Sequence, residues 1–253
     1  MGIAISVVSY ASSFFNVHLS ALQVILYSAL ILIFTGAAVA GGTSFSVKMS
    51  SLSMFLQMIP VMIISIIGLF FFDPDIFTAA WNPHHYTVVQ TIGFSNSFTL
   101  WAFLGLESAC SNMERVKNPE RNVPIAVIAA TVAIGAFSIL YTTVIQGIVP
   151  NTVLAQSNAP FGDACAYMFG PEAGHLVTAL MIVGCGGALI AWQFTLVELL
   201  RSGAKEGYFP KIFGRVNSYD IPVRGIIGVL FIQMVLLSMT GSPSMVKQFD
   251  ALI

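Results

Sequence analysis

Long apolar runs separated by short polar segments dominate this sequence. A helix needs roughly 20 apolar residues to cross the hydrocarbon core of a bilayer. The pattern predicts six such spans, at Leu19–Ala40, Leu52–Phe72, Val88–Met113, Val123–Val149, Ala173–Leu200 and Gly225–Met239. Two shorter apolar stretches stand at the ends, where Met1–Phe14 is interpreted as the tail of a helix and residues 249–253 as the start of another. We expect a single transmembrane domain over residues 1–253, cut at both ends.

Composition supports a membrane protein. Hydrophobic residues make up 57% of the chain and charged residues 8%, with a mean hydropathy of +0.86, far outside the range of soluble globular domains. The prediction is an all-α, polytopic membrane protein whose surroundings are the lipid bilayer. Met1–Phe14 has no basic run before it and no small-residue cleavage site after it, which argues against a signal peptide. A formal net charge of -1 gives no reason to expect a nucleic acid partner.

The basic residues predict an orientation. Nine of the ten Lys and Arg residues fall in the connections that follow the first, third and fifth spans, and only Lys247 falls on the opposite side. Cytoplasmic loops of membrane proteins carry an excess of Lys and Arg. The connections that contain Lys48, Arg115–Arg121 and Arg201–Arg224 are therefore expected to be cytoplasmic. The chain is expected to reach the opposite face at Asn16–His18, at 73–86, at 150–172 and at its last residues.

Few residues suggest chemistry of the enzymatic kind. Cys110, Cys165 and Cys185 have no metal-ligand spacing and are interpreted as small apolar packing residues. The adjacent His84 and His85 lack a cysteine or carboxylate cluster beside them, so a solvated interfacial pair is favoured over a metal site. No serine, histidine and acid set is recognisable in the spans. The sequence predicts a protein that is not an enzyme and has neither a cofactor nor a metal.

Glu107 is the candidate functional residue within a span. An ionised side chain in a bilayer is costly, so such residues usually face a bundle interior or a watery cavity. Small and polar residues surround it, in particular Gly93–Ser97, Gly105, Ser108 and Ser111, and these favour close helix approach or a local break in the helix. A carboxylate beside a broken helix suits a cationic solute. The alternative, a structural glutamate near a helix end, stays open because Glu114 and Arg115 follow within two turns.

Two tryptophans strengthen the interpretation of a cation site. Trp101 precedes Glu107 by six residues, and Trp192 lies deep in the fifth span, away from the interfacial belts where tryptophan collects. Indole faces attract ammonium and guanidinium groups, although core packing also accounts for a buried tryptophan. The stretch "GCGGALIAW", Gly184–Trp192, would let a backbone or a substrate approach closely. Glu198 is expected to pair with Arg201 near the cytoplasmic interface.

Four stretches carry a family resemblance. They are "LWAFLGLESACSNMERVKNPERNVPIAV" at 100–127, "APFGDA" at 159–164, "AWQFTL" at 191–196 and "EGYFPKIFGRVN" at 206–217. In this order they resemble the basic amino acid and polyamine antiporters of the amino acid, polyamine and organocation (APC) transporter superfamily. The resemblance implies part of an inverted-repeat (LeuT-like) fold of twelve helices, of which the six spans would be helices four to nine.

The resemblance also implies site residues. Trp101 would stack on the substrate as an aromatic gate, Glu107 would recognise the substrate, and Leu104 and Trp192 would border it. The residues expected to line the pathway are Gly105, Ser108, Cys185 and Ala188. Two positions depart from the family pattern. Ala188 stands where these exchangers often have serine, and Glu198 stands where they have glutamine.

The function implied by the resemblance is antiport by alternating access. The substrates would be small cations, a basic amino acid and a diamine, of the putrescine/ornithine type, with arginine/agmatine or lysine/cadaverine exchange as alternatives. The expected location is a bacterial inner membrane, and a homo-oligomer is left open. A second interpretation also stays open, namely a truncated membrane polypeptide that does not transport, because helix one of the family would supply half of the site.

Overall fold

The computed structural model describes residues 1–82, 86–105, 117–217 and 221–239, and these form helices and no strand. The helices are α1 (Gly2–Phe14), α2 (Ala21–Ala40), α3 (Thr43–Ile67) continued by η1 (Gly68–Phe71), α4 (Pro74–Ala80), α5 (Val88–Phe103), α6 (Pro119–Ile148), α7 (Asn151–Leu154), α8 (Pro160–Phe169), α9 (Pro171–Lys205), η3 (Lys211–Gly214) and α10 (Val223–Ser238). The fold is all-α, as the apolar runs predict.

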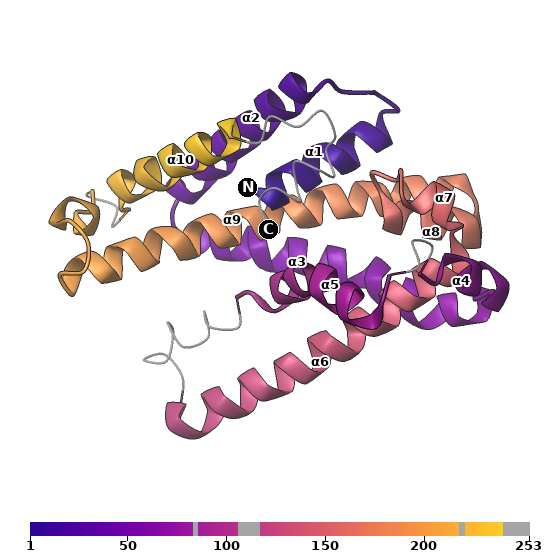
Figure 1. Ribbon diagram of the computed structural model, residues 1–253. Helices are drawn as coiled ribbons and strands as arrows, with labels where there is room; N and C mark the ends of the chain where they lie inside the picture. Colours follow the sequence, from indigo (N-terminus) through magenta and orange to yellow (C-terminus); the bar gives the residue numbers. More distant parts are fainter. Residues whose placement is uncertain (83–85, 106–116, 218–220, 240–253) are drawn as a thin grey trace.

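Helix α9 is the central element. It is 35 residues long and packs against α1, α2, α3, α8 and α10. Figure 1 shows α9 between α2 and α10 on one side and α3, α5 and α6 on the other. Any functional side chain on α9 is therefore held by neighbours on several sides.

Four helices among the described residues are long and apolar enough to cross a membrane, namely α2, the stretch Phe45–Phe71, α6 and α9. The helices α1 and α10 are apolar but shorter. Helix α5 ends at Phe103, inside the span expected over Val88–Met113, and residues 106–113 of that span lie outside the described residues.

Local signals explain where several helices begin and end. Ser20 and Gln23 form a capping box at the start of α2, in which each side chain accepts a hydrogen bond from the backbone N–H of the other residue. Asp73 caps α4 by accepting the backbone N–H of Asp75 at 2.8 Å. Gly170, at φ 96°, separates α8 from α9 in a conformation that favours glycine.

Short helices lie in the segments 73–86 and 150–172, which connect the expected spans. They are α4, α7 and α8, and they were not predicted from the sequence. These helices are 7, 4 and 10 residues long, too short for an apolar run to mark them. Proline stands at the first helical position of α4 and of α8, and Asp73 caps α4, so these are the local signals for the two helices.

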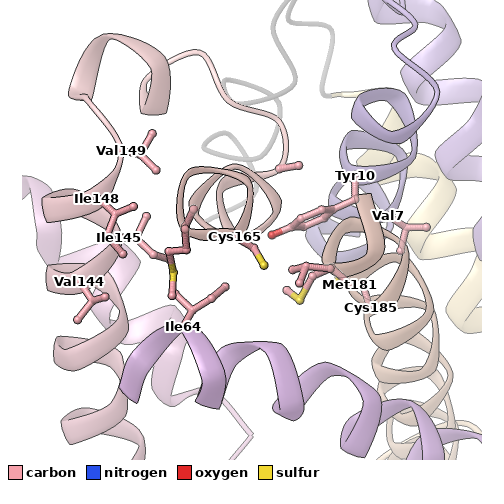
Figure 2. Close-up of a cluster of buried hydrophobic side chains, with 14 residues drawn as sticks. Val7, Tyr10, Ile64, Val144, Ile145, Ile148, Val149, Cys165, Met181 and Cys185 are labelled. Carbon is pink, nitrogen blue, oxygen red and sulfur yellow. The ribbon is translucent and has the colours of Figure 1, made fainter. Parts of the chain in front are cut away.

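The largest apolar cluster joins five helices. Figure 2 shows side chains of α1, α3, α6, α8 and α9 converging, with Tyr10, Ile64, Cys165, Met181 and Cys185 among them. The sulfur atoms of both cysteines lie within this cluster, and both thiols are free. Cys165 and Cys185 are 5% and 8% exposed, so their interpretation as small apolar packing residues is confirmed.

The outward surface is apolar over long helical stretches. On α6, the side chains of Ile128, Val132 and Ile139 are 65%, 68% and 71% exposed. Large aliphatic side chains on the outside of a helix are stable in lipid rather than in water. This surface is that of an integral membrane protein.

Glycines set the spacing between α3 and α9. A β-carbon at Gly187 would lie 2.0 Å from Cβ of Ser53, and one at Gly184 would lie 2.5 Å from Cβ of Gln57. A β-carbon at Gly186 would meet nothing within 4 Å. Gly184 and Gly187 therefore let the two helices approach closely, the use that small residues serve at helix interfaces in membranes.

Gly187→Ala is expected to destabilise the protein, since α3 and α9 must separate to admit the methyl group. Overpacking of this kind costs about 1 to 3 kcal/mol. Thermal unfolding in detergent, followed by size-exclusion chromatography, measures the loss. Gly186→Ala is the matched control on the same helix and should unfold at the temperature of the unchanged protein. Equal unfolding temperatures for both variants would contradict the close approach at Gly187.

Candidate functional site

The end of α5 meets the middle of α9. Helix α5 stops at Phe103, and Gly105 follows at φ 107°, a backbone conformation that L side chains rarely adopt. A β-carbon on Gly105 would lie 3.0 Å from Cζ2 and 3.2 Å from Cη2 of Trp192. Glycine is needed here for two reasons, the positive φ and the closeness of the indole ring.

A second contact holds the end of α5. A β-carbon on Gly135 of α6 would lie 3.5 Å from Cζ of Phe103, so the phenyl ring packs over that glycine. Helix α5 is therefore held between α6, at Phe103, and α9, at Gly105. The carboxyl end of a helix carries partial negative charge from its last carbonyl groups. The indole of Trp192 thus lies beside a place that favours a cation.

The structure brings together two of the predicted site residues and separates others. Gly105 and Trp192 meet, and Leu104 beside them has a side chain that is 57% exposed. Cys185 lies in the five-helix cluster of Figure 2 rather than at Trp192, and Ala188 is half-buried on α9 between them. The roles of these residues stay predictions.

The structure says little about three other predicted site residues, Trp101, Glu107 and Ser108. Trp101 belongs to α5, two residues before its end. Glu107 and Ser108 lie outside the described residues, as do His84, His85 and Cys110. Their predicted roles therefore rest on the sequence.

An ion pair lies near the carboxyl end of α9. Arg201 Nη1 lies 3.4 Å from Glu198 Oε1, and the two side chains are 16% and 35% exposed. The expected pairing of these residues is confirmed. Glu198, which departs from the family pattern, is therefore charge-compensated and is not counted among the binding residues.

The described part of the chain contains no group of three or more His, Cys, Asp and Glu residues that could hold a metal ion. A pocket of about 390 Å³ lies elsewhere, between the carboxyl end of α1 and α2, and its lining includes Val8, Phe15 and Leu30. It is apolar and contains none of the predicted site residues.

Sequence reasoning missed two buried amides, Gln193 and Gln233, which are 2% and 6% exposed. They hydrogen bond to each other between α9 and α10. A single amide within an otherwise apolar helical run was the available signal, because polar groups in spans are costly and need partners.

The fold is that of an all-α integral membrane protein. Residues 1–252 match the amino acid permease family, and the chain belongs to that family. The predicted resemblance to APC transporters is therefore confirmed.

Three relatives are similar along most of the chain. The chain is 46% identical over 253 residues to the putrescine transporter PotE of Escherichia coli strain K12, covering 100% of this chain and 58% of that protein. It is 45% identical over 251 residues to the putrescine transporter PotE of Haemophilus influenzae, with coverages of 99% and 58%. It is 35% identical over 228 residues to the cadaverine/lysine antiporter of Escherichia coli strain K12, with coverages of 90% and 51%. The chain thus spans little more than half the length of these relatives.

Proposed function

We propose that this chain is part of a membrane antiporter that exchanges a diamine of the putrescine type for a basic amino acid such as ornithine, by alternating access. The observation that carries the proposal is the contact of Gly105 at the end of α5 with the indole of Trp192. A helix terminus with partial negative charge beside an aromatic face suits an ammonium group. The similarity to two putrescine transporters supports the choice of diamine.

Roles follow for the side chains around this contact. Trp101 and Trp192 would stack on the cation, Glu107 would compensate its charge, and Leu104 would border it. Ser108 and Ala188 would line the route. No covalent step is needed, because exchange requires only that each substrate binds and leaves.

The proposal is tested by exchange in proteoliposomes. The chain is completed with the preceding and following segments of the Escherichia coli putrescine transporter, reconstituted, loaded with ornithine and supplied with labelled putrescine. Uptake that depends on internal ornithine is the expected result. Parallel vesicles with lysine and cadaverine, or with arginine and agmatine, test the other pairs. If none of these pairs is exchanged, the proposal is overturned. If lysine and cadaverine are exchanged faster than putrescine and ornithine, they replace putrescine and ornithine as the proposed substrate pair.

The 253-residue chain is assayed beside the completed protein. If the segments outside it supply half of the site, the short chain should show no saturable exchange. This result would favour the second interpretation for the short chain alone, a polypeptide that does not transport by itself. Saturable exchange by the short chain would show that its own residues suffice.

The proposed orientation places the Lys- and Arg-rich connections in the cytoplasm of a bacterial cell with the protein in the inner membrane. The nine-to-one distribution of basic residues supports it. In a background without native cysteines, new cysteines at the exposed positions Lys117 and Glu206 should be shielded from an impermeant thiol reagent applied outside. A cysteine at Ala79 should react. Labelling of Glu206→Cys from outside would contradict the orientation.

A further inference from the structure

Helices α2, α9 and α10 are joined by a buried polar contact. Gln193 Nε2 on α9 donates to the backbone oxygen of Leu32 on α2 at 3.1 Å and to Gln233 Oε1 on α10 at 3.2 Å. Both glutamines are almost fully buried. The amide orientation follows from these partners, because the flipped amide of Gln193 would place its oxygen against two other oxygens.

The surroundings of this contact are apolar. Leu32 belongs to a cluster with Leu189 and Leu237, one turn from Gln193 and Gln233 respectively. A second cluster, which contains Val197 and Val229, lies on the other side. A buried amide amid such side chains loses its hydration, so its hydrogen bonds are needed to offset that cost.

Stability alone does not account for Gln193. Within the described part of the chain, Gln193 Oε1 and Ser28 Oγ of α2 are buried without a hydrogen-bond partner. Apolar residues of similar volume at both positions 193 and 233 would pack here without leaving an amide oxygen unpaired. The two hydrogen bonds of Gln193 do, however, require their donor and acceptor atoms to lie in a particular direction, a requirement that apolar packing lacks.

That direction adds a constraint on the rotation of α9 about its axis. Consecutive residues of a helix project about 100° apart. Gln193 faces α2 and α10, while its neighbour Trp192 faces Gly105 at the end of α5. A single rotation of α9 about its axis would therefore have two effects. It would break the hydrogen bonds of Gln193, and it would move the indole of Trp192 away from Gly105.

We propose that Gln193 is a positioning residue for Trp192, because its hydrogen bonds to Leu32 and Gln233 hold the indole of Trp192 against the end of α5. The expected effect on transport rests on the proposed function. The position of the Trp192 indole does not depend on transport and can be measured separately.

The test uses the completed, reconstituted protein and the variant Gln193→Met, which keeps the length and volume of the side chain and removes its hydrogen bonds. The expected result is a rise in the KM for putrescine of about threefold to tenfold, the range of one to two hydrogen bonds between helices in a membrane. Membrane abundance should stay near that of the unchanged protein. The unfolding temperature should fall for Gln193→Met, which leaves Gln233 Oε1 buried without its donor, and should stay near the unchanged value when both glutamines are replaced by methionine. Gln233→Met should change KM in the same direction but less, because the bond to Leu32 remains.

Thr195→Val is the matched control. Thr195 is two residues further along α9, and its hydroxyl donates to the backbone oxygen of Ala191 within the same helix at 3.0 Å. Replacing Thr195 by valine removes a hydrogen bond within α9 but none between α9 and its neighbouring helices. The control should leave KM unchanged, and the double variant Gln193→Met/Gln233→Met should be no worse than Gln193→Met alone.

A spectroscopic measurement separates position from transport. With every other tryptophan replaced by phenylalanine, acrylamide quenching reports on Trp192 alone. Gln193→Met should increase quenching, and Thr195→Val should not. Unchanged quenching together with an unchanged KM would overturn the inference, and so would a lowered unfolding temperature with unchanged quenching. If the unchanged protein exchanges no substrate, the proposed function fails while quenching still decides the inference.

Discussion

Glu107→Gln is expected to lower putrescine exchange by tens of fold while leaving the amount of protein in the membrane nearly unchanged. Glutamine keeps the shape of glutamate and removes its charge, so in the proposed site a cationic substrate would lose its desolvated partner. Breaking a buried charge pair costs about 2 to 5 kcal/mol. The measurement is the initial rate of ornithine-dependent putrescine uptake by the completed protein, normalised to protein in the vesicles.

Glu198→Gln is the matched control for this variant. Glu198 already has a positive partner in Arg201 and is about one-third exposed, so losing its charge should change uptake little. Trp101→Leu should lower uptake less than Glu107→Gln, because the cation–π contact proposed for Trp101 would be the weaker interaction. If Glu107→Gln transported normally but accumulated poorly, Glu107 would be a structural residue near a helix end.

Gly105→Ala is expected to give the second large loss of exchange. Its methyl group would meet the Trp192 ring at 3.0 Å, and the residue would have to keep φ 107°. Backbone strain of this kind costs about 1 to 3 kcal/mol, and the ring would also have to move. Uptake should therefore fall about tenfold or more, with a higher KM because the indole leaves its place.

Gly93→Ala provides the comparison on the same helix. A β-carbon at Gly93 meets nothing within 4 Å, and this glycine is not among those with positive φ. Alanine also favours a helix over glycine. Gly93→Ala should transport at the unchanged rate. Equal KM values for the two alanine variants would exclude a role for the Gly105 backbone in placing Trp192.

The sequence predicted the long helices well, because an apolar run of about 20 residues allows few alternatives. It also predicted the ion pair of Glu198 and Arg201, whose spacing of three residues brings side chains together on any helix. The short helices α4 and α8 were not predicted, since the proline that begins each of them and the Asp73 cap of α4 are weak signals beside a hydrophobic run.

The site was less accessible to sequence reasoning. Glycines at 184 and 187 were expected to admit a backbone or a substrate, and the structure assigns them to the approach of α3. A single sequence contains no record of which helix faces which. For the same reason the partnership of Gln193, Gln233 and Leu32, three residues far apart in the chain, could not be derived from spacing.

The charge distribution along α9 makes the two routes away from Trp192 unequal. The segment Leu176–Val197 has no acidic or basic residue and lies between His175 and Glu198. At 1.5 Å per residue, Trp192 is about 9 Å from Glu198 and about 24 Å from Leu176 along the helix axis. A solute beside Trp192 is therefore less than two helical turns from the polar boundary at the Arg201 end. On the other side more than four turns of uncharged helix follow. If the proposed route runs along α9, its longer part would therefore have no charged group of α9 to compensate a cation.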